Sequence, residues 1–253
     1  MIDRMRIENM SIGYKGNVLV KNISTDLRSG VTAIIGRNGA GKSTLIKTLT
    51  GNIRPLAGDA FINNLSIQSI AKKDLAKIMA LVTSDTKTAG GLKLKELVAL
   101  GRIPFTGYMG ILPREDKDKI EDAMIRVGIV HKKDSFVSEL SDGERQRGLI
   151  AKGLVQDTPI IIMDEPFSYL DVASRLEMYY LTKQLAEEKG KAILYSTHEM
   201  VEAINYVDNF WVITKEGFES GTKKEILEND TLNRIFPNER VKYIKETGTF
   251  NFI

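Results

Sequence analysis

The sequence predicts an α/β fold: a mixed β-sheet core with antiparallel strands at its N-terminal end and an inserted helical subdomain. Three observations support this prediction. A glycine-rich loop at residues 36–44 stands between an apolar strand and a helix, the order that a phosphate-binding loop requires. From Ile160 onward, apolar runs alternate with helical patterns. Between these two halves, from about Leu94 to Val155, the pattern is mostly helical.

The loop itself, GRNGAGKST at residues 36–44, predicts binding of a nucleoside triphosphate. Its glycines let several backbone N–H groups point inward, and the following helix adds its positive N-terminal end. We expect Lys42 to reach the β- and γ-phosphates and the Ser43 hydroxyl to ligate Mg²⁺. An accidental glycine-rich turn is disfavoured, because a buried strand at 31–35 and a helix at 43–49 flank the loop. The expected nucleotide-binding residues here are Gly36, Asn38, Gly39, Ala40, Gly41, Lys42, Ser43 and Thr44.

The strands fall into two groups. Short β-branched segments, which we expect to pair in antiparallel fashion, lie at residues 5–7, 18–27 and 60–62. Apolar strands, which we expect to be parallel and buried, lie at residues 160–163, 192–196 and 210–213. Helical patterns at 172–189 and 199–207 alternate with the second group, as βαβ units require.

The middle of the chain is expected to carry helices at residues 94–100, 114–127 and 142–155. The glycines, prolines and aromatic residues of segment 101–113 predict an irregular connection. One or two short helices are expected within 222–236, and 241–253 either adds a strand or trails. We therefore predict a single domain, 1–253, with a core at about 1–86 and 158–221, a helical subdomain at about 87–157 and a short tail at 222–253.

Composition excludes several kinds of site and partner. The formal net charge is +3, and Lys and Arg are spread among matching acids, so no nucleic-acid surface is expected. Cysteine is absent, which excludes disulfides, thiolate zinc sites and cysteine nucleophiles and is compatible with a reducing cytosol. No apolar run approaches the roughly 18 residues of a membrane span. We expect no direct membrane insertion and action at a membrane only through partners.

A second motif, IIIMDEP at residues 160–166, is an apolar strand that ends in two acids. Ligands bind at the carboxyl ends of strands in open α/β sheets, so Asp164 and Glu165 are expected to lie beside the phosphate loop. Asp164 is expected to hold the Mg²⁺ hydration shell, and Glu165 to polarise the attacking water as general base. An acid pair at a strand end is often only solvated, but the upstream phosphate loop favours the catalytic interpretation.

The segment LSDGERQR at residues 140–147 opens a helix just upstream of that strand. Ser141 is a plausible N-cap, and Glu144 three residues later completes a capping box. The capping box does not explain Gly143, because glycine in a first turn weakens a helix unless another group approaches the backbone. A second phosphate group is one candidate.

These motifs together resemble the ATP-binding cassette (ABC) family, the ATPase subunits of ABC transporters, over about residues 2–225. Residues 36–44 match its Walker A loop, 140–146 its LSGGQ signature, 160–165 its Walker B strand, 168–171 its D-loop and 196–198 its switch histidine. The resemblance implies a P-loop NTPase fold that hydrolyses ATP with Mg²⁺. It also implies that Tyr14, otherwise an ordinary strand-end tyrosine, stacks on adenine, and that His198 contacts the γ-phosphate and serves with Glu165 in catalysis.

In this family two cassettes associate head to tail, so that the signature of one chain covers the ATP on the Walker A loop of the other. The resemblance implies a homodimer in the ATP-bound state, with Ser141 and Gly143 meeting the γ-phosphate across the boundary. It further implies integral-membrane permease subunits, a substrate-binding protein that acts through the permease, and a peripheral position on the cytoplasmic face of the cell membrane.

Three residues depart from the family pattern. Ser84 occupies the position of the Q-loop glutamine, which usually touches Mg²⁺ and the attacking water. Ser84 is expected to reach the metal only through water, and the alternative is that the neighbouring Asp85 serves as an acidic outer-shell ligand. Asp142 replaces a glycine of the signature, and Glu144 replaces its glutamine. These departures affect the expected rate and coupling rather than nucleotide binding.

The segment KELVALGRIPF at residues 95–105 is similar to VxELVxxGRxP of importer ATPases for iron–siderophore, haem and cobalamin uptake. The alternative is a generic amphipathic helix closed by a C-terminal glycine. We therefore expect an importer ATPase that docks its permease through about residues 83–110. An exporter ATPase and a non-transport ATPase, such as an iron–sulfur assembly component, are the remaining alternatives.

Overall fold

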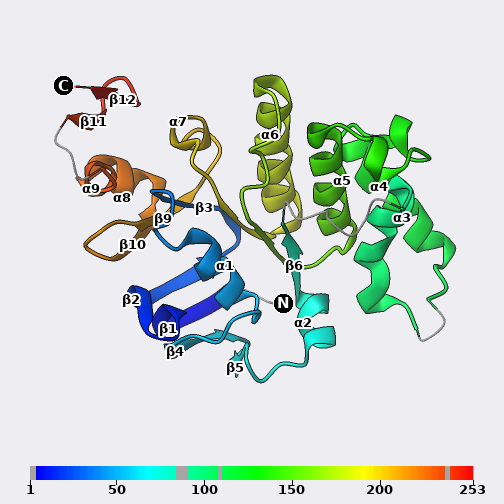
Figure 1. Ribbon diagram of the computed structural model, residues 1–253, viewed down its shortest axis with the longest axis horizontal. Coiled ribbons are helices and arrows are strands. Elements are labelled where there is room, and N and C mark those ends of the chain that lie inside the picture. Colours follow the sequence, from blue (N-terminus) through cyan, green and yellow to red (C-terminus); the bar gives the residue numbers. More distant parts are fainter. Residues whose placement is uncertain (1–3, 84–90, 108–109, 237–239, 253) are drawn as a thin grey trace.

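The chain folds into two lobes around one central sheet. The computed structural model describes residues 4–83, 91–107, 110–236 and 240–252. Figure 1 shows a lobe rich in strands on one side and a lobe of helices on the other. The expected α/β class, with N-terminal antiparallel strands and a helical insertion, is confirmed. The lobe boundaries near residues 87 and 157 stay a prediction.

The N-terminal sheet is antiparallel and has the strand order β2-β1-β4-β5. Its strands are β1 (Arg4–Tyr14), β2 (Asn17–Arg28), β4 (Ala57–Ile62) and β5 (Leu65–Ser66). Strand β1 extends well beyond the expected residues 5–7. Its pairing register shifts near Asn9, which has a φ of 46°. This irregularity moves the side-chain alternation by one residue, so that Met10 and Ile12 are buried like Met5 and Ile7.

The central sheet has the order β10-β9-β3-β8-β7-β6. Its strands are β3 (Gly30–Gly36), β6 (Met79–Val82), β7 (Ile160–Met163), β8 (Ala192–Ser196), β9 (Asn209–Ile213) and β10 (Phe218–Thr222). All pairings are parallel except that of β9 with the edge strand β10. Because β3 and β7 both flank β8, the segments that follow these three strands meet at one edge of the sheet.

Strand β3 separates two hydrophobic clusters. Ile34 packs with the N-terminal sheet and the helix that follows the glycine-rich loop, whereas Val31 and Ile35 pack with residues of the helical lobe. Alternating side chains on a strand point to opposite faces, so a strand buried on both sides is apolar throughout. The glycine-rich loop therefore leaves a strand that is fixed from both faces.

Helices cover both faces of the central sheet and form the second lobe. The helices of the strand-rich lobe are α1 (Lys42–Leu49), α2 (Lys72–Ile78), α6 (Val172–Lys189), α7 (Met200–Ala203), α8 (Lys223–Glu228) and α9 (Thr231–Arg234). Those of the helical lobe are α3 (Leu94–Ala99), η1 (Leu100–Phe105), α4 (Arg114–Arg126), η2 (Val130–Lys132), η3 (Val137–Glu139) and α5 (Asp142–Val155). None of the helices in the described ranges combines the length and apolarity that a membrane span requires.

Two expectations about elements need correction, and two elements add to what the sequence indicates. Segment 101–113 is not wholly irregular, because η1 continues directly from α3. Helix α2 was not expected from the sequence. Of the two possibilities for residues 241–253, the strand is correct: β11 (Val241–Ile244) pairs with β12 (Thr249–Phe252) in a hairpin. The helix expected at 199–207 is only one turn long. A turn follows at residues 204–206, and by Asp208 the chain has reached β3: the N–H of Asp208 donates to the carbonyl oxygen of Val31, and its carboxylate accepts the N–H of Val31, at 2.8 Å each.

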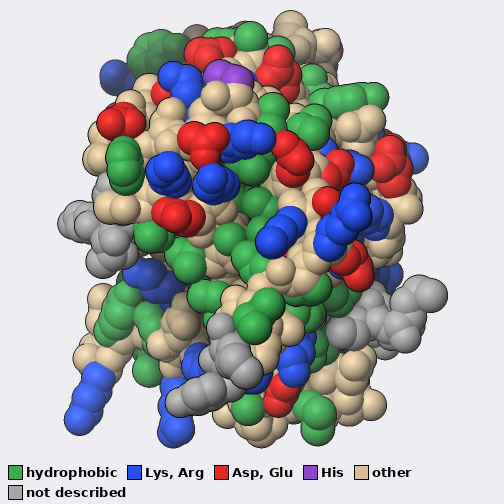
Figure 2. All heavy atoms as spheres, turned by 90° about the vertical axis from the view of Figure 1, so that its right-hand side faces the viewer, with side chains coloured by type: hydrophobic (Ala, Val, Ile, Leu, Met, Phe, Trp, Pro, Cys, Tyr) green, Lys and Arg blue, Asp and Glu red, His purple; other side chains and the backbone are tan. Residues whose placement is uncertain are grey.

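The outer face of the helical lobe carries both signs of charge. Figure 2 looks onto this side of the molecule, where basic and acidic side chains are interspersed above a more apolar region. The pairs include Lys95 with Asp134 at 2.6 Å and Arg126 with Asp122 at 2.8 Å. Exposed pairs of this kind contribute little stability, so this face is a solvated surface rather than a field of one sign.

Candidate functional site

The glycine-rich loop forms one wall of a cleft of about 330 Å³. The lining residues are Leu19, Asn38, Gly39, Gly41, Lys42, Ser43, Thr44, Glu165 and His198. Gly41 has a φ of 110°, in the left-handed region that L side chains rarely adopt, and it turns the loop into α1. The loop residues, the acid after β7 and the histidine after β8 were predicted separately, and the fold brings them into one cavity.

Lys42 is buried at the base of this loop. Its ammonium donates to the carbonyl oxygen of Gly36 at 2.9 Å and to that of Arg37 at 3.4 Å. Burial lowers the pKa of Lys42, while the nearby carboxylates of Glu165 and Asp164 oppose that shift. The hydrogen bonds of this buried ammonium go to carbonyl oxygens, which carry no full negative charge. An anionic ligand such as a phosphate would therefore stabilise its charge strongly.

A hydroxyl group and a carboxylate meet beside the loop. The Ser43 hydroxyl donates to Asp164 Oδ1 at 3.0 Å, so the hydroxyl after β3 and the carboxylate after β7 touch directly. Ser196, at the end of β8 between them, donates to the same Oδ1 at 2.7 Å and accepts the backbone N–H of Glu165 at 2.9 Å. Ser196 is fully buried, and it fixes the acid pair from the strand that separates β3 from β7.

Glu165 has an unusual backbone. Its φ of 46° places a non-glycine residue in the left-handed region, a conformation that persists only where the surroundings enforce it. Its Oε2 lies 3.8 Å from Nδ1 of His198, and Nε2 of His198 lies 3.5 Å from Oε1 of Glu199. The cleft therefore ends in a carboxylate and an imidazole that face each other.

The family model for ABC transporters matches residues 20–168. This chain belongs to the ABC transporter family. It is 34% identical over 238 residues to the iron(3+)-hydroxamate import ATP-binding protein of Bacillus subtilis, covering 93% of this chain and 88% of that protein. The ferric enterobactin transport ATP-binding protein of Escherichia coli is also 34% identical over 238 residues, with the same coverages of 93% and 88%.

The fold agrees with this membership. A solved structure of an ABC transporter assigned to the metal-chelate type, in an inward-facing conformation, has a TM-score of 0.81 at 23% sequence identity, covering 99% of this chain and 97% of that chain. The sequence-based identification as an ABC ATP-binding subunit is thus confirmed. Subunits of this family bind ATP and hydrolyse it to power transport.

The ABC signature lies on a different part of the surface. Ser141 caps α5: its hydroxyl accepts the N–H of Glu144 at 3.2 Å, and Glu144 Oε2 accepts the N–H of Ser141 at 2.9 Å. That N–H, with help from Lys132, lowers the pKa of Glu144. The expected capping box is therefore confirmed. Neither Ser141 nor Gly143 lines the cleft that holds Lys42.

The fold offers its own reason for Gly143. A side chain at this position would place its Cβ 3.3 Å from the carbonyl oxygen of Tyr169, which belongs to the D-loop of the same chain. The close approach of the D-loop is thus an explanation beside the second phosphate group that the sequence suggested. This approach of Tyr169 to Gly143 brings the signature and the D-loop together.

For two of the predicted site residues, Tyr14 and Ser84, the structure gives no position in the cleft. Tyr14 ends β1 at the tip of the β1–β2 hairpin, where it is half exposed and not among the cleft-lining residues, although Leu19 of the same hairpin is. Ser84, expected near the metal, lies outside the described residues, as does the neighbouring Asp85.

Sequence reasoning missed three residues that the structure brings to the site. Leu19 had no motif to indicate it. Ser196 was noted only as part of the switch-histidine motif, although a hydroxyl at the end of a buried strand was a usable signal. Arg175 on α6 bonds Glu202 at 2.5 and 2.8 Å and lies 3.6 Å from Glu199, so it anchors α7 and the residue that follows His198.

Proposed function

We propose that this chain is the ATP-hydrolysing subunit of an ABC importer for a metal chelate of the iron–siderophore, haem or cobalamin type. One observation carries the catalytic part: the phosphate loop and the Glu165–His198 pair line one cleft, and Ser43 in that cleft bonds Asp164. The two siderophore-related relatives and the segment at residues 95–105 support the importer assignment.

The donor atoms suit ATP with Mg²⁺. Ser43 and Asp164 would hold the ion, because hydroxyl and carboxylate oxygens are ligands that a hard divalent cation prefers. Within the described residues no cluster of three or more acidic or histidine side chains could hold a metal, so phosphate oxygens and water would complete the shell. Bound there, Mg²⁺ neutralises phosphate charge during phosphoryl transfer. A contact from Ser84 through water is part of this proposal.

The remaining residues divide the chemical work. The backbone N–H groups of residues 38–44 and the Lys42 ammonium bind the phosphates, and the burial of Lys42 strengthens that attraction. Glu165 accepts the proton of the attacking water, and the left-handed backbone at this residue directs its carboxylate toward His198. His198 orients Glu165 and contacts the γ-phosphate. Tyr14 stacks on the adenine from the hairpin tip.

Ser141 and Gly143 complete the site from a second copy of the chain. They lie outside the cleft of their own chain and on the surface shared with the D-loop, which supports a head-to-tail homodimer closed by ATP. Hydrolysis then reopens the dimer. Family membership implies membrane permeases as partners, and we place the subunit on the cytoplasmic face of the membrane, with a substrate-binding protein acting through the permease.

The test of the catalytic proposal is ATP turnover by the purified chain and two variants. Lys42→Ala should lose ATP binding, since among the described residues no other lysine lines the cleft. Glu165→Gln should keep ATP binding and lose at least about 100-fold in kcat, because an amide cannot accept the proton. If either variant hydrolyses ATP at the unmodified rate, this cleft is not the catalytic site.

A transport assay tests the importer part of the proposal. Vesicles containing the permease should accumulate a ferric chelate only with ATP and an intact Glu165.

A further inference from the structure

His198 lies between two anchored segments, and its own side-chain contacts are long. Its Nδ1 lies 3.8 Å from Oε2 of Glu165 and its Nε2 lies 3.5 Å from Oε1 of Glu199, both longer than a strong hydrogen bond. On one side of it, Ser196 ends β8 and is fixed by its hydrogen bonds to the acid pair. On the other side is the single turn of α7, so the anchoring of α7 decides where the imidazole points.

Arg175 of α6 anchors that turn. Its side chain is only 11% exposed, and its guanidinium bonds both carboxylate oxygens of Glu202 on α7, at 2.5 and 2.8 Å. Its Nη1 also lies 3.6 Å from Oε1 of Glu199, and this same oxygen lies 3.5 Å from Nε2 of His198. One carboxylate oxygen therefore connects a nearly buried cation to the imidazole.

The face of α6 that carries Arg175 also holds the far end of the turn. Tyr179, one helical turn further along, stacks on Tyr206 with ring centroids 5.4 Å apart and an interplanar angle of 12°. The start of α6 is itself fixed, because the carboxylate of Asp171 accepts the N–H of Ser174 at 2.9 Å and so caps the helix. The turn after His198 is thus docked at both ends onto one helix.

We propose that Arg175 is a positioning residue for the reaction at Glu165: through Glu199 it holds the imidazole of His198 facing that carboxylate. The inference rests on the proposed function and adds a residue to it. Without the guanidinium, the carboxylates of Glu199 and Glu202 lose the cation between them and repel each other, so the turn moves and carries the imidazole with it. A displacement of about 1 Å in a reacting group can cost about a hundredfold in rate.

The experiment compares the kcat and the ATP affinity of the purified chain with those of Arg175→Gln. We expect kcat to fall about tenfold or more, with ATP affinity within about threefold of the parent value, because the phosphate loop is unchanged. The matched control is Arg234→Gln, which breaks the bidentate pair of Arg234 with Glu219, at 2.6 and 2.5 Å. Neither residue of that pair lines the cleft, so kcat should stay within about twofold.

Two results of this comparison would overturn the inference. Equal losses of kcat in Arg175→Gln and Arg234→Gln would show a general effect of losing a bidentate ion pair. Equal losses of kcat and ATP affinity in Arg175→Gln would show that the residue supports the folding of the whole cleft.

A second variant, Glu199→Ala, tests the route to His198 without breaking the main ion pair. It leaves the pair of Arg175 with Glu202 in place and removes the oxygen that lies between Arg175 and His198. We expect Tm to stay within about 2 °C of the parent value and kcat to fall about fivefold or more. An unchanged kcat contradicts the proposed route and overturns the inference.

A double-variant cycle separates this inference from the proposed function. In a His198→Ala background, Arg175→Gln should change the single-turnover rate by no more than about twofold, because its effect passes through the missing imidazole. A further loss of about tenfold in that background overturns the inference and leaves the proposed function intact. If His198→Ala itself hydrolyses ATP at the parental rate, the proposed role of His198 fails, and the inference fails with it.

Discussion

At the scale of single residues, Asp164 and the backbone of Glu165 depend on the buried hydroxyl of a neighbouring strand end, that of Ser196. Ser196 joins Asp164 and the backbone of Glu165 through two hydrogen bonds of 2.7 and 2.9 Å. Because Glu165 has a left-handed backbone with a φ of 46°, its conformation must be enforced by contacts such as this one. Ser196 is therefore a positioning residue for the acid pair.

Replacing that hydroxyl tests its role. In Ser196→Ala, the buried N–H of Glu165 loses its partner, which costs about 1–3 kcal/mol. We expect kcat to fall about tenfold or more, with ATP affinity within about threefold, because the phosphate-binding residues are untouched. Steady-state kinetics and direct ATP titration measure the two effects. Equal losses of affinity and kcat would instead indicate that the whole cleft had collapsed.

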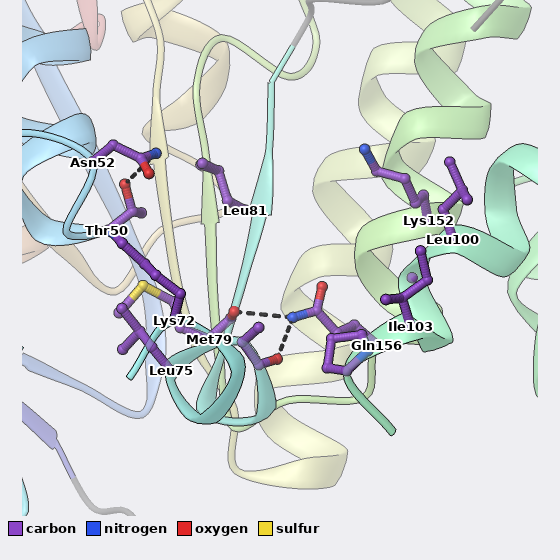
Figure 3. A pocket seen from close by; sticks show the side chains of 13 residues that line it. Thr50, Asn52, Lys72, Leu75, Met79, Leu81, Leu100, Ile103, Lys152 and Gln156 are labelled. Atoms are coloured by element: carbon purple, nitrogen blue, oxygen red, sulfur yellow. Dashed lines mark hydrogen bonds between the residues drawn. The ribbon is translucent and has the colours of Figure 1, made fainter. Parts of the chain in front are cut away.

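At the scale of elements, the structure gives a packing role to residues 101–104 (GRIP) of the importer-like segment 95–105. Arg102 is buried, and its guanidinium bonds Asp116 of α4 at 2.9 Å and the carbonyl oxygen of Val155 at the end of α5 at 3.0 Å. Its guanidinium carbon also lies 4.2 Å from the ring centroid of Phe105. A cation at the C-terminal end of α5 complements the helix dipole. Arg102 thus joins η1, α4 and α5 and fixes η1 as one wall of a groove of about 400 Å³ between the two lobes (Figure 3).

The energetic role of this pair can be measured. Arg102→Met leaves the buried carboxylate of Asp116 without its cation, and we expect the free energy of unfolding to fall by about 3–5 kcal/mol. In Arg102→Met/Asp116→Leu, much of that loss should return, since no unpaired charge remains. Urea unfolding of the two variants and the parent chain provides the comparison. If the double variant is as unstable as the single one, the carbonyl and ring contacts of Arg102 dominate rather than the ion pair.

At the scale of the whole molecule, the nucleotide cleft and the ABC signature lie on different lobes of the chain. Lys42 and Glu165 line the cleft, whereas Ser141 caps α5 in the other lobe, so one chain alone does not bring them together. Part of the signature surface is formed by the approach of Tyr169 to Gly143. This separation is the physical reason to expect two chains in the active assembly.

The expected assembly is an ATP-dependent dimer. With hydrolysis blocked, Glu165→Gln should elute as a dimer in ATP and Mg²⁺ and as a monomer without nucleotide, because bound ATP bridges the two chains. The matched control is Glu165→Gln/Ser141→Arg, which keeps the cleft but blocks the signature surface and should remain monomeric while still binding ATP. Size-exclusion chromatography with light scattering distinguishes these states. Dimers of the control variant would contradict the head-to-tail arrangement.

The sequence by itself determined the chemistry of the nucleotide site and the family. Gly41, Lys42 and Ser43 follow one another in the chain, and Asp164 and Glu165 end an apolar strand, so local spacing was sufficient to recognise both motifs. The capping box of Ser141 and Glu144 was predictable for the same reason, since its partners are three residues apart. Metal contact by Ser84 and the roles of the individual site residues stay predictions.

Only the tertiary structure decided which distant residues act together. The bridge from Ser196 to Asp164 spans two strands, the ion pair of Arg102 joins two helices, and Arg175 holds the turn that follows His198. The bond between Asp208 and Val31 of β3 likewise joins segments that are far apart in the sequence. None of these follows from local periodicity, because each depends on which segments the strand order and the packing of the two lobes bring into contact.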